Sequence, residues 1–266
     1  MRKLLNVDAN AKTVKGQKRG YLTGILYLAP ADLSGYEVCP QRSAGCTKAC
    51  LNTAGRGAFS NVQTSRISKT KYYFENRPAF MDDLVLNIKA LERKAKRMGL
   101  TPVVRLNGTS DIAWERVPVG GFPNIMAVFP HLTMYDYSKV TKRAVAYGEG
   151  RMPPNYHLTF SLTEDNDADA ILAMNAGCNV AVVFNENAYN RYVAAGNWWF
   201  GIAYTQALTE MSIDEMSIKQ LKDEVIDGDQ SDLRFADKHG DDGTGLIVAL
   251  KAKGPARHDT SGFVRS

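Results

Sequence analysis

The sequence lacks the features that mark several common classes of protein. Nowhere in its 266 residues does an apolar run reach the roughly eighteen residues that a membrane-spanning helix needs. The start of the chain is too polar to act as a secretory signal, so we expect a soluble, cytoplasmic protein with no membrane partner. Internal repeats and low-complexity segments are also missing, and the length suits one sizeable domain.

Several catalytic motifs are missing as well. The four histidines have no metal-site spacing, and the chain contains no G-x-S-x-G, H-E-x-x-H or P-loop motif. His131 and His157 stand at the start of predicted strands, the end of a barrel that carries stability rather than chemistry. We therefore expect both histidines to be structural.

Cysteine is scarce but concentrated. Three of the four cysteines, Cys39, Cys46 and Cys50, fall within twelve residues, in a loop after a predicted buried strand at 21–30. Three thiolates can hold three irons of a four-iron, four-sulfur (4Fe-4S) cluster and leave the fourth iron open, or supply most of a zinc site. Only Cys46 and Cys50 have zinc-like spacing, so zinc would need a remote histidine or carboxylate. We expect a metal centre here and favour iron–sulfur over zinc; unligated thiols are the remaining alternative.

The fourth cysteine, Cys178, has a different setting. It stands where a predicted helix ends and an apolar strand begins, as expected of a small buried hydrophobic residue. A reducing cytosol and a chain of this length both argue against a disulfide framework.

Strands and helices alternate along most of the chain. Strands are predicted at 103–107, 132–136, 156–161, 179–184, 200–204, 225–227 and 245–251, and helices at 78–98, 165–174, 187–194 and 212–224. Strands separated by helical returns pair in parallel through right-handed crossovers. The fold class is therefore α/β, with a parallel (β/α) barrel, complete or partial and TIM-like, and a cysteine-rich loop after its first strand. We expect one barrel domain at 21–254, a basic arm or short edge element at 1–20 and a polar tail at 255–266.

Polar side chains follow the predicted strands where each strand ends. Because parallel strands end at one face of a barrel, these residues are expected to converge. The candidate catalytic residues are Asp111, Asp136 and Lys139. The candidates for binding a cofactor are Arg105, Asn107, Ser161, Glu164 and Lys251. A charge within an apolar strand needs a carboxylate or an anionic ligand, whereas an aspartate after a strand is often only a helix cap.

Basic residues outnumber acidic residues by 33 to 28. A nucleotide or nucleic acid is therefore a candidate partner, held through phosphate contacts. The candidate nucleic-acid-binding residues follow the cysteines: Arg56, Arg66, Lys69 and Lys71. The basic cluster at 89–97 is equally well explained as a solvated helix face.

Four segments of the sequence resemble a known family. They are G-Y-L-T-G-I-L-Y-L-A-P at 20–30, C-P-Q-R-S-A-G-C-T-K-A-C-L at 39–51, R-L-N-G-T-S-D at 105–111 and D-L-R-F at 232–235. Together they resemble the bacteriophage proteins called gene product 88, over residues 20–254. The resemblance implies a phage origin, and hence the host cytoplasm, but no particular activity.

A looser resemblance concerns the cysteine loop. Three cysteines after the first strand of a parallel barrel are similar to the radical S-adenosylmethionine (SAM) superfamily, where the loop carries a cluster whose open iron binds SAM. That superfamily usually has three and then two residues between its cysteines, whereas this chain has six and then three.

Three functions stay open from the sequence. The first is a phage-encoded, radical SAM-like iron–sulfur enzyme acting on a nucleotide or nucleic acid, in which the cofactor supplies the chemistry. The second is a zinc-containing barrel in which Asp111 or Asp136 attacks a nucleoside by base exchange or hydrolysis. The third is a phage protein that is not an enzyme and binds nucleic acid or a host protein, with a structural metal.

Overall fold

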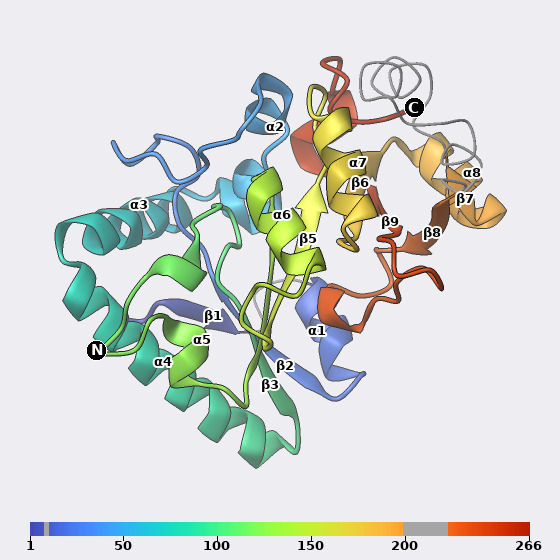
Figure 1. Ribbon diagram of the computed structural model, residues 1–266. Helices are drawn as coiled ribbons and strands as arrows, with labels where there is room; N and C mark the ends of the chain where they lie inside the picture. The colour runs from blue at the N-terminus through green and yellow to red at the C-terminus, as the bar shows by residue number, and fades with distance from the viewer. Residues whose placement is uncertain (8–10, 199–222) are drawn as a thin grey trace.

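One mixed sheet runs through the molecule. The computed structural model describes residues 1–7, 11–198 and 223–266, and the sheet has nine strands in the order β1-β2-β3-β4-β5-β6-β9-β8-β7 (Figure 1). The edge strands β1 and β7 pair antiparallel with their neighbours, and all the strands between them run parallel. The strands are β1 Leu5–Val7, β2 Tyr21–Leu26, β3 Thr101–Arg105, β4 Thr133–Ser138, β5 Tyr156–Ser161, β6 Val180–Phe184, β7 Asn197–Trp198, β8 Asp223–Asp227 and β9 Ile247–Lys251.

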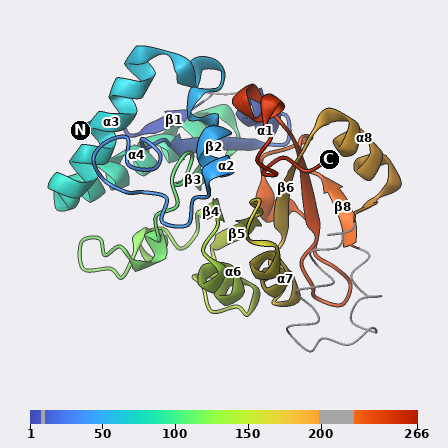
Figure 2. The same ribbon diagram turned by 90° about the horizontal axis from the view of Figure 1, so that it is seen from above.

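The helices connect the strands and cover the sheet. They are α1 Ala11–Gln17, α2 Ala44–Lys48, α3 Ser60–Glu75, α4 Arg77–Met98, α5 Ile125–Val128, α6 Thr141–Gly148, α7 Asp167–Asn175 and α8 Glu186–Ala195. In Figure 2, α3 and α4 lie at the β1 end of the sheet and α8 at the other end, while α6 and α7 lie between them. Among the helices of the described residues, none has the length and apolar character needed to cross a membrane.

The longest helix, α4, shows how the sequence encodes these elements. Asn76 caps it by accepting a hydrogen bond from the backbone N–H of Ala79, and Pro78 stands in its first turn, where a missing N–H costs nothing. Gly99 ends it in the left-handed conformation, with a φ of 67°. The residues that α4 buries recur every three or four positions and form a stripe: Phe80, Met81, Leu84, Ile88, Leu91 and Ala95.

The two faces of the sheet are covered differently. Alternate strand residues such as Val104, Met134 and Leu158 join the core beneath the long helices, which we call the helix face. Their neighbours Val103 and Tyr135 point to the opposite side and pack against Leu233 in the segment 228–240. We call this side the loop face.

The α/β class and the mostly parallel sheet are confirmed, but a closed barrel is not what the described residues form. The sheet stays open because β1 covers the free edge of β2 with antiparallel bonds, and because β9 and β8 follow β6 in the sheet before β7 ends it. The predicted strand at 200–204 and most of the predicted helix at 212–224 lie outside the described residues.

The two ends of the chain contribute to the fold. The first twenty residues include the edge strand β1 and the helix α1. Near the other end, the backbone of Arg265 bonds to Val183 and Asn185, and its guanidinium pairs with Asp167 at 2.8 Å. The segment at 255–266 therefore lies against the carboxyl ends of the strands.

Candidate functional site

Four loops meet at the carboxyl edge of the parallel strands, the side where α/β proteins usually carry their sites. The loop after β2 carries the three cysteines, and the loops after β3, β4 and β5 carry Asp111, Lys139 and Glu164. Bonds between these loops hold them together: the backbone N–H of Asp111 donates to the carbonyl of Val38 at 2.7 Å.

The short helix α2 positions Cys46 and Cys50. Ser43 caps it by accepting from the N–H of Cys46 at 3.0 Å. Glu164 then holds this end of the helix, since its carboxylate accepts from Ser43 Oγ at 2.7 Å and from the N–H of Gly45 at 2.6 Å. A side chain at Gly45 would meet Glu164 and Ser261 at less than 3 Å. Glycine is thus required where α2 approaches the β5 loop.

Cys39 is held by a strained turn. Its sulfur accepts from the N–H of Ala31 at 3.4 Å and lies 3.8 Å from the carbonyl of Thr109. Among the described residues other than glycine, Ala31 alone has a positive φ, 53°, a conformation that alanine adopts at a cost. Such strain persists only where the surroundings impose it, and it gathers at functional sites.

Lys139 lies beside the thiols. Its ammonium donates to Ser161 Oγ at 3.1 Å and to the sulfur of Cys46. Burial is the largest single influence and lowers the pKa of Lys139, but the charges of Cys46, Asp111 and Cys39 together raise that pKa above its usual value. We call Cys39, Cys46, Cys50 and Lys139 the thiol cluster.

The thiols also act on one another. Burial above all, with the charges of Cys50 and Cys46 acting in the same direction, raises the pKa of Cys39 to about 12. Burial likewise raises the pKa of Cys50, where Lys139 and Arg66 act in the opposite direction. As the side chains are placed, the described part of the chain has no three His, Cys, Asp or Glu residues close enough to hold a metal ion together. The cysteines are neighbours without being at ligand spacing.

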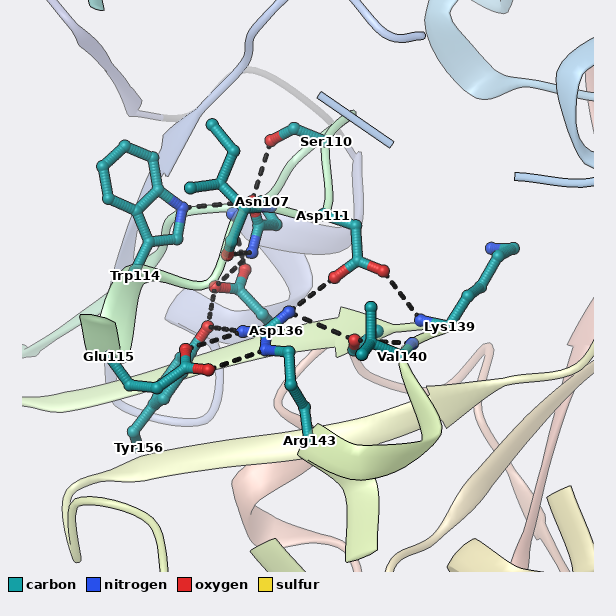
Figure 3. A network of polar contacts seen from close by, with 12 residues as sticks. Asn107, Ser110, Asp111, Trp114, Glu115, Asp136, Lys139, Val140, Arg143 and Tyr156 are labelled. Atoms are coloured by element: carbon teal, nitrogen blue, oxygen red, sulfur yellow. Dashed lines mark hydrogen bonds and ion pairs between the residues drawn. The ribbon is translucent and has the colours of Figure 1, made fainter. Parts of the chain in front are cut away.

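A second cluster lies on the helix-face side of the same edge and consists of Asp111, Glu115, Asp136 and Arg143, which we call the carboxylate cluster (Figure 3). The Arg143 side chain is 3 % exposed. It pairs with both oxygens of Glu115 at 2.9 Å and with Asp111 at 2.6 Å. The other oxygen of Asp111 accepts from the backbone N–H of Lys139 at 2.8 Å, so Asp111 joins the two clusters.

Asp136 is fully buried in this cluster. Its carboxylate accepts from the N–H of Asn107 at 2.6 Å and from the hydroxyl of Tyr156 at 2.8 Å. Burial raises its pKa from 3.8 to about 7, against the lowering effects of Asn107 and nearby arginines. The side chain of Asn107 is in turn held by Trp114, whose indole N–H donates to Asn107 Oδ1 at 3.0 Å.

The predicted cofactor-binding residues Arg105 and Lys251 lie on opposite faces of the sheet. Arg105 is on the loop face, where it pairs with Asp232 at 3.1 Å and stacks over Tyr137. Lys251 is on the helix face and pairs with Glu186 of α8 at 3.1 Å. Of the five residues expected around one pocket, Asn107, Asp111 and Asp136 therefore lie together, whereas Arg105 and Lys251 lie on opposite faces of the sheet.

The candidate nucleic-acid-binding residues differ in how far they are exposed. Arg56 and Lys71 are exposed, whereas Arg66 is only 7 % exposed. Lys69 is half-buried and donates to the carbonyl of Leu4 at 2.8 Å, and burial lowers its pKa to about 8. Nucleic-acid binding through these residues stays a prediction.

Sequence reasoning missed Glu115, Arg143 and Tyr156. The available signal was the apolar face of α6, because Arg143 precedes the buried Ala144 and follows the N-terminus of that helix by two residues. A charged residue on a buried helix face requires partners, and three carboxylates stand nearby in the folded chain.

Comparisons with known proteins give one family. The family described as gene product 88 matches residues 3–266, which confirms the first resemblance over nearly the whole chain. Neither the curated proteins nor the solved structures contain a match. Nothing in these comparisons supports the looser resemblance to the radical SAM superfamily.

Proposed function

The chain belongs to the gene product 88 family of bacteriophage proteins, and we propose from its geometry that it is an iron–sulfur enzyme. Its cluster would be held by Cys39, Cys46 and Cys50. The observation that carries this proposal is that the three thiols gather beside Lys139 at the carboxyl edge of the parallel strands.

The donor set fits a cluster better than a bare ion. Three sulfurs suit a four-iron cluster, in which the fourth iron is left for another group, whereas structural zinc sites are closed by four ligands. The sulfurs would have to move closer together to share a cluster. Metal binding is expected to order such a site, because metal affinity and folding are coupled.

The surrounding residues have clear tasks in this proposal. Lys139 offsets part of the negative charge of three thiolates, and the N–H of Ala31 orients Cys39. Glu164 fixes the position of α2 and hence of Cys46 and Cys50. When bound, the cluster would supply one-electron chemistry at its open iron.

SAM is the proposed co-substrate, and a nucleotide or nucleic acid the proposed substrate, in a radical-type reaction in the host cytoplasm. The row of parallel strands from β2 to β8 supports the interpretation of the open sheet as a partial (β/α) barrel. The thiol cluster would then lie at the open end of that barrel, at the carboxyl ends of its strands. Asp111 and Asp136, predicted to be catalytic, fit better as residues that position Lys139 and the β3 loop.

The test is metal analysis of protein purified and reconstituted without oxygen. About four irons and four sulfides per chain are expected, with the brown colour of an iron–sulfur protein. The variants Cys39→Ser, Cys46→Ser and Cys50→Ser should each lose most of the iron. Cys178→Ser is the matched control, because Cys178 is completely buried in the core beneath α7 and should not affect iron content.

Two results would redirect the proposal. Zinc in place of iron, lost in the same three variants, would favour the zinc-containing enzyme. A wild-type protein that takes up neither metal after reconstitution would contradict a metal centre and leave a binding function.

A further inference from the structure

Arg66 is a buried cation without a carboxylate partner. It is 7 % exposed, lies on the inner side of α3 and stacks over Tyr27, with its guanidinium carbon 4.9 Å from the ring centre. Burial lowers its pKa, and no acidic side chain of the described residues pairs with it. A buried charge of this kind normally requires an anion.

The hydrogen bonds of Arg66 show which edge of the guanidinium is free. Its Nη1 donates to the carbonyl of Asn52 at 2.9 Å and also to the Asn52 side chain. Its Nε is buried and has no partner, and Nη2 makes no bond within residues 1–7, 11–198 and 223–266. The Nε–Nη2 edge is the one that binds carboxylate or phosphate with two parallel hydrogen bonds.

Lys139 provides a second cation in the same place. Its ammonium bonds to Ser161 and Cys46 and makes no ion pair with a carboxylate of the described residues, although the charge of Asp111 acts on it. Cys50 feels the charges of both Lys139 and Arg66. Arg66 is also joined to Cys50 through Asn52, which accepts from Arg66 and donates its N–H to the sulfur of Cys50 at 3.5 Å. The two cations therefore flank the thiol cluster from different elements, the loop after β4 and the helix α3.

We infer that Arg66 and Lys139 form an anion-binding subsite beside the thiol cluster, and that it takes the carboxylate or phosphate of a small co-substrate. The inference rests on the proposed function for the role of that co-substrate, but the subsite itself is built from protein groups alone. Arg105 does not belong to the subsite, because Asp232 already neutralises it.

An alternative explanation, which needs no ligand, is that both cations only offset the negative charge of the thiolates. Three thiolates on a four-iron core carry a small net negative charge, which Lys139 alone would largely balance. Arg66 would then remain uncompensated, with a bidentate edge that no thiolate uses. An anion with two oxygens fits this edge better than a single sulfur does.

The test is titration calorimetry on anaerobically prepared protein of measured iron content. The probes are SAM, decarboxylated SAM and inorganic phosphate. Wild-type protein should bind SAM at least about tenfold more tightly than the decarboxylated form, because the lost carboxylate would leave Arg66 unpaired. If the natural anion is a phosphate, inorganic phosphate should bind and the two SAM forms should not differ.

Variants then assign the effect to Arg66. Arg66→Gln should weaken binding of the preferred probe about 10- to 100-fold and remove the preference for the carboxylate. Arg66→Lys keeps the charge near Cys50 but lacks the bidentate edge, so it should retain iron and still lose about tenfold. Arg93→Gln is the matched control, because it removes the same charge from an exposed position on α4 and should bind as wild type does.

Two outcomes would overturn the inference: wild-type protein that binds neither SAM nor phosphate, or Arg66→Gln protein that keeps the wild-type affinity and preference. The result would be different if the proposed iron–sulfur function were wrong and the anion-binding subsite were correct. In that case the protein would contain no iron, yet phosphate would bind and depend on Arg66.

Discussion

The carboxylate cluster and the thiol cluster share one edge of the sheet but differ in how their charges are satisfied. In the carboxylate cluster, Arg143 faces two carboxylates at 2.6 and 2.9 Å, and Asp136 is surrounded by hydrogen-bond donors. In the thiol cluster, Lys139 donates to Ser161 and Cys46 and makes no ion pair within the described residues, and the Nε of nearby Arg66 has no partner. Paired charges hold the loops in place, whereas unpaired charges are available to a ligand.

The two clusters also differ in their proposed roles, since the carboxylate cluster positions a loop and the thiol cluster binds a ligand. Asp111 touches the backbone of Lys139 on one side and Arg143 on the other. The carboxylate cluster therefore fixes the loop that presents Lys139 without being part of the thiol cluster itself. This arrangement resembles the way outer hydrogen bonds orient the ligands of a metal site.

The largest difference between the two clusters is expected when one arginine is removed from each region, Arg143 from the carboxylate cluster and Arg66 from beside the thiol cluster. Arg143→Met should lower the free energy of unfolding by about 3–5 kcal/mol, because it leaves Asp111 and Glu115 buried without their cation. Arg66→Met should change it by less than about 1 kcal/mol, since it removes a desolvated charge together with its bonds to Asn52. Urea unfolding of both variants measures this, and equal losses would mean that Arg66 is as structural as Arg143.

The pH dependence of stability gives a second test of the carboxylate cluster, through the titration of Asp136. The pKa of Asp136 is raised from 3.8 to about 7, so between these values the folded protein holds a proton that the unfolded chain releases. Stability contributed by this group is present at low pH and is lost as the pH rises through 7. The expected loss between pH 4 and pH 8 is at most roughly 4 kcal/mol.

Asp136→Asn isolates this effect, because the amide imitates the protonated carboxyl group. The variant should unfold with a smaller decrease in stability from pH 4 to pH 8 than wild type, measured by denaturant titration at each pH. Identical pH profiles would show that Asp136 is charged in the folded protein throughout this range.

The sequence predicted which residues lie at the carboxyl ends of the strands better than it predicted the face of the sheet on which each side chain lies. The strands β2, β3, β4, β5, β6, β8 and β9 all fall on predicted strands, since apolar runs between helices are a strong signal. The sequence pattern also placed the cysteine loop, Lys139, Ser161 and Glu164 at the carboxyl ends of strands. It could not show which residues meet there.

The reason is the period of two along a strand. Asp136 alternates with Tyr135 along β4 and so lies on the helix face, whereas Lys139 follows the last residue of the strand, Ser138, and bonds to Ser161. Arg105 and Lys251 are separated in the same way, by the faces to which Val103 and Ala249 belong. The signal for Arg143 was weak, because α6 is a helix of eight residues and a single cation beside its buried Ala144 does not make a distinctive pattern.

The contact between α2 and Glu164 offers a smaller test. Glu164→Gln should cost about 1 kcal/mol of stability, because one charge-assisted hydrogen bond to Ser43 or Gly45 is weakened. It should also reduce the iron retained after reconstitution, since α2 carries Cys46. Glu186→Gln changes the same group at an exposed position, 73 % accessible, and should do neither. Unchanged iron in Glu164→Gln protein would mean that the position of α2 does not matter to the centre.

The smallest effect is expected at Lys251, which the sequence placed in the same pocket as Arg105. Its ammonium lies over Tyr189 and pairs with the exposed carboxylate of Glu186 at 3.1 Å, and such surface pairs contribute little because water screens them. Lys251→Gln should therefore shift the free energy of unfolding by less than about 0.5 kcal/mol in a urea titration. It should also leave iron content and anion binding at wild-type levels, because β9 turns this side chain to the helix face, where its contacts are with Glu186 and Tyr189 of α8. A loss of anion binding comparable to that of Arg66→Gln would contradict this placement and would indicate that Lys251 takes part in the anion-binding subsite.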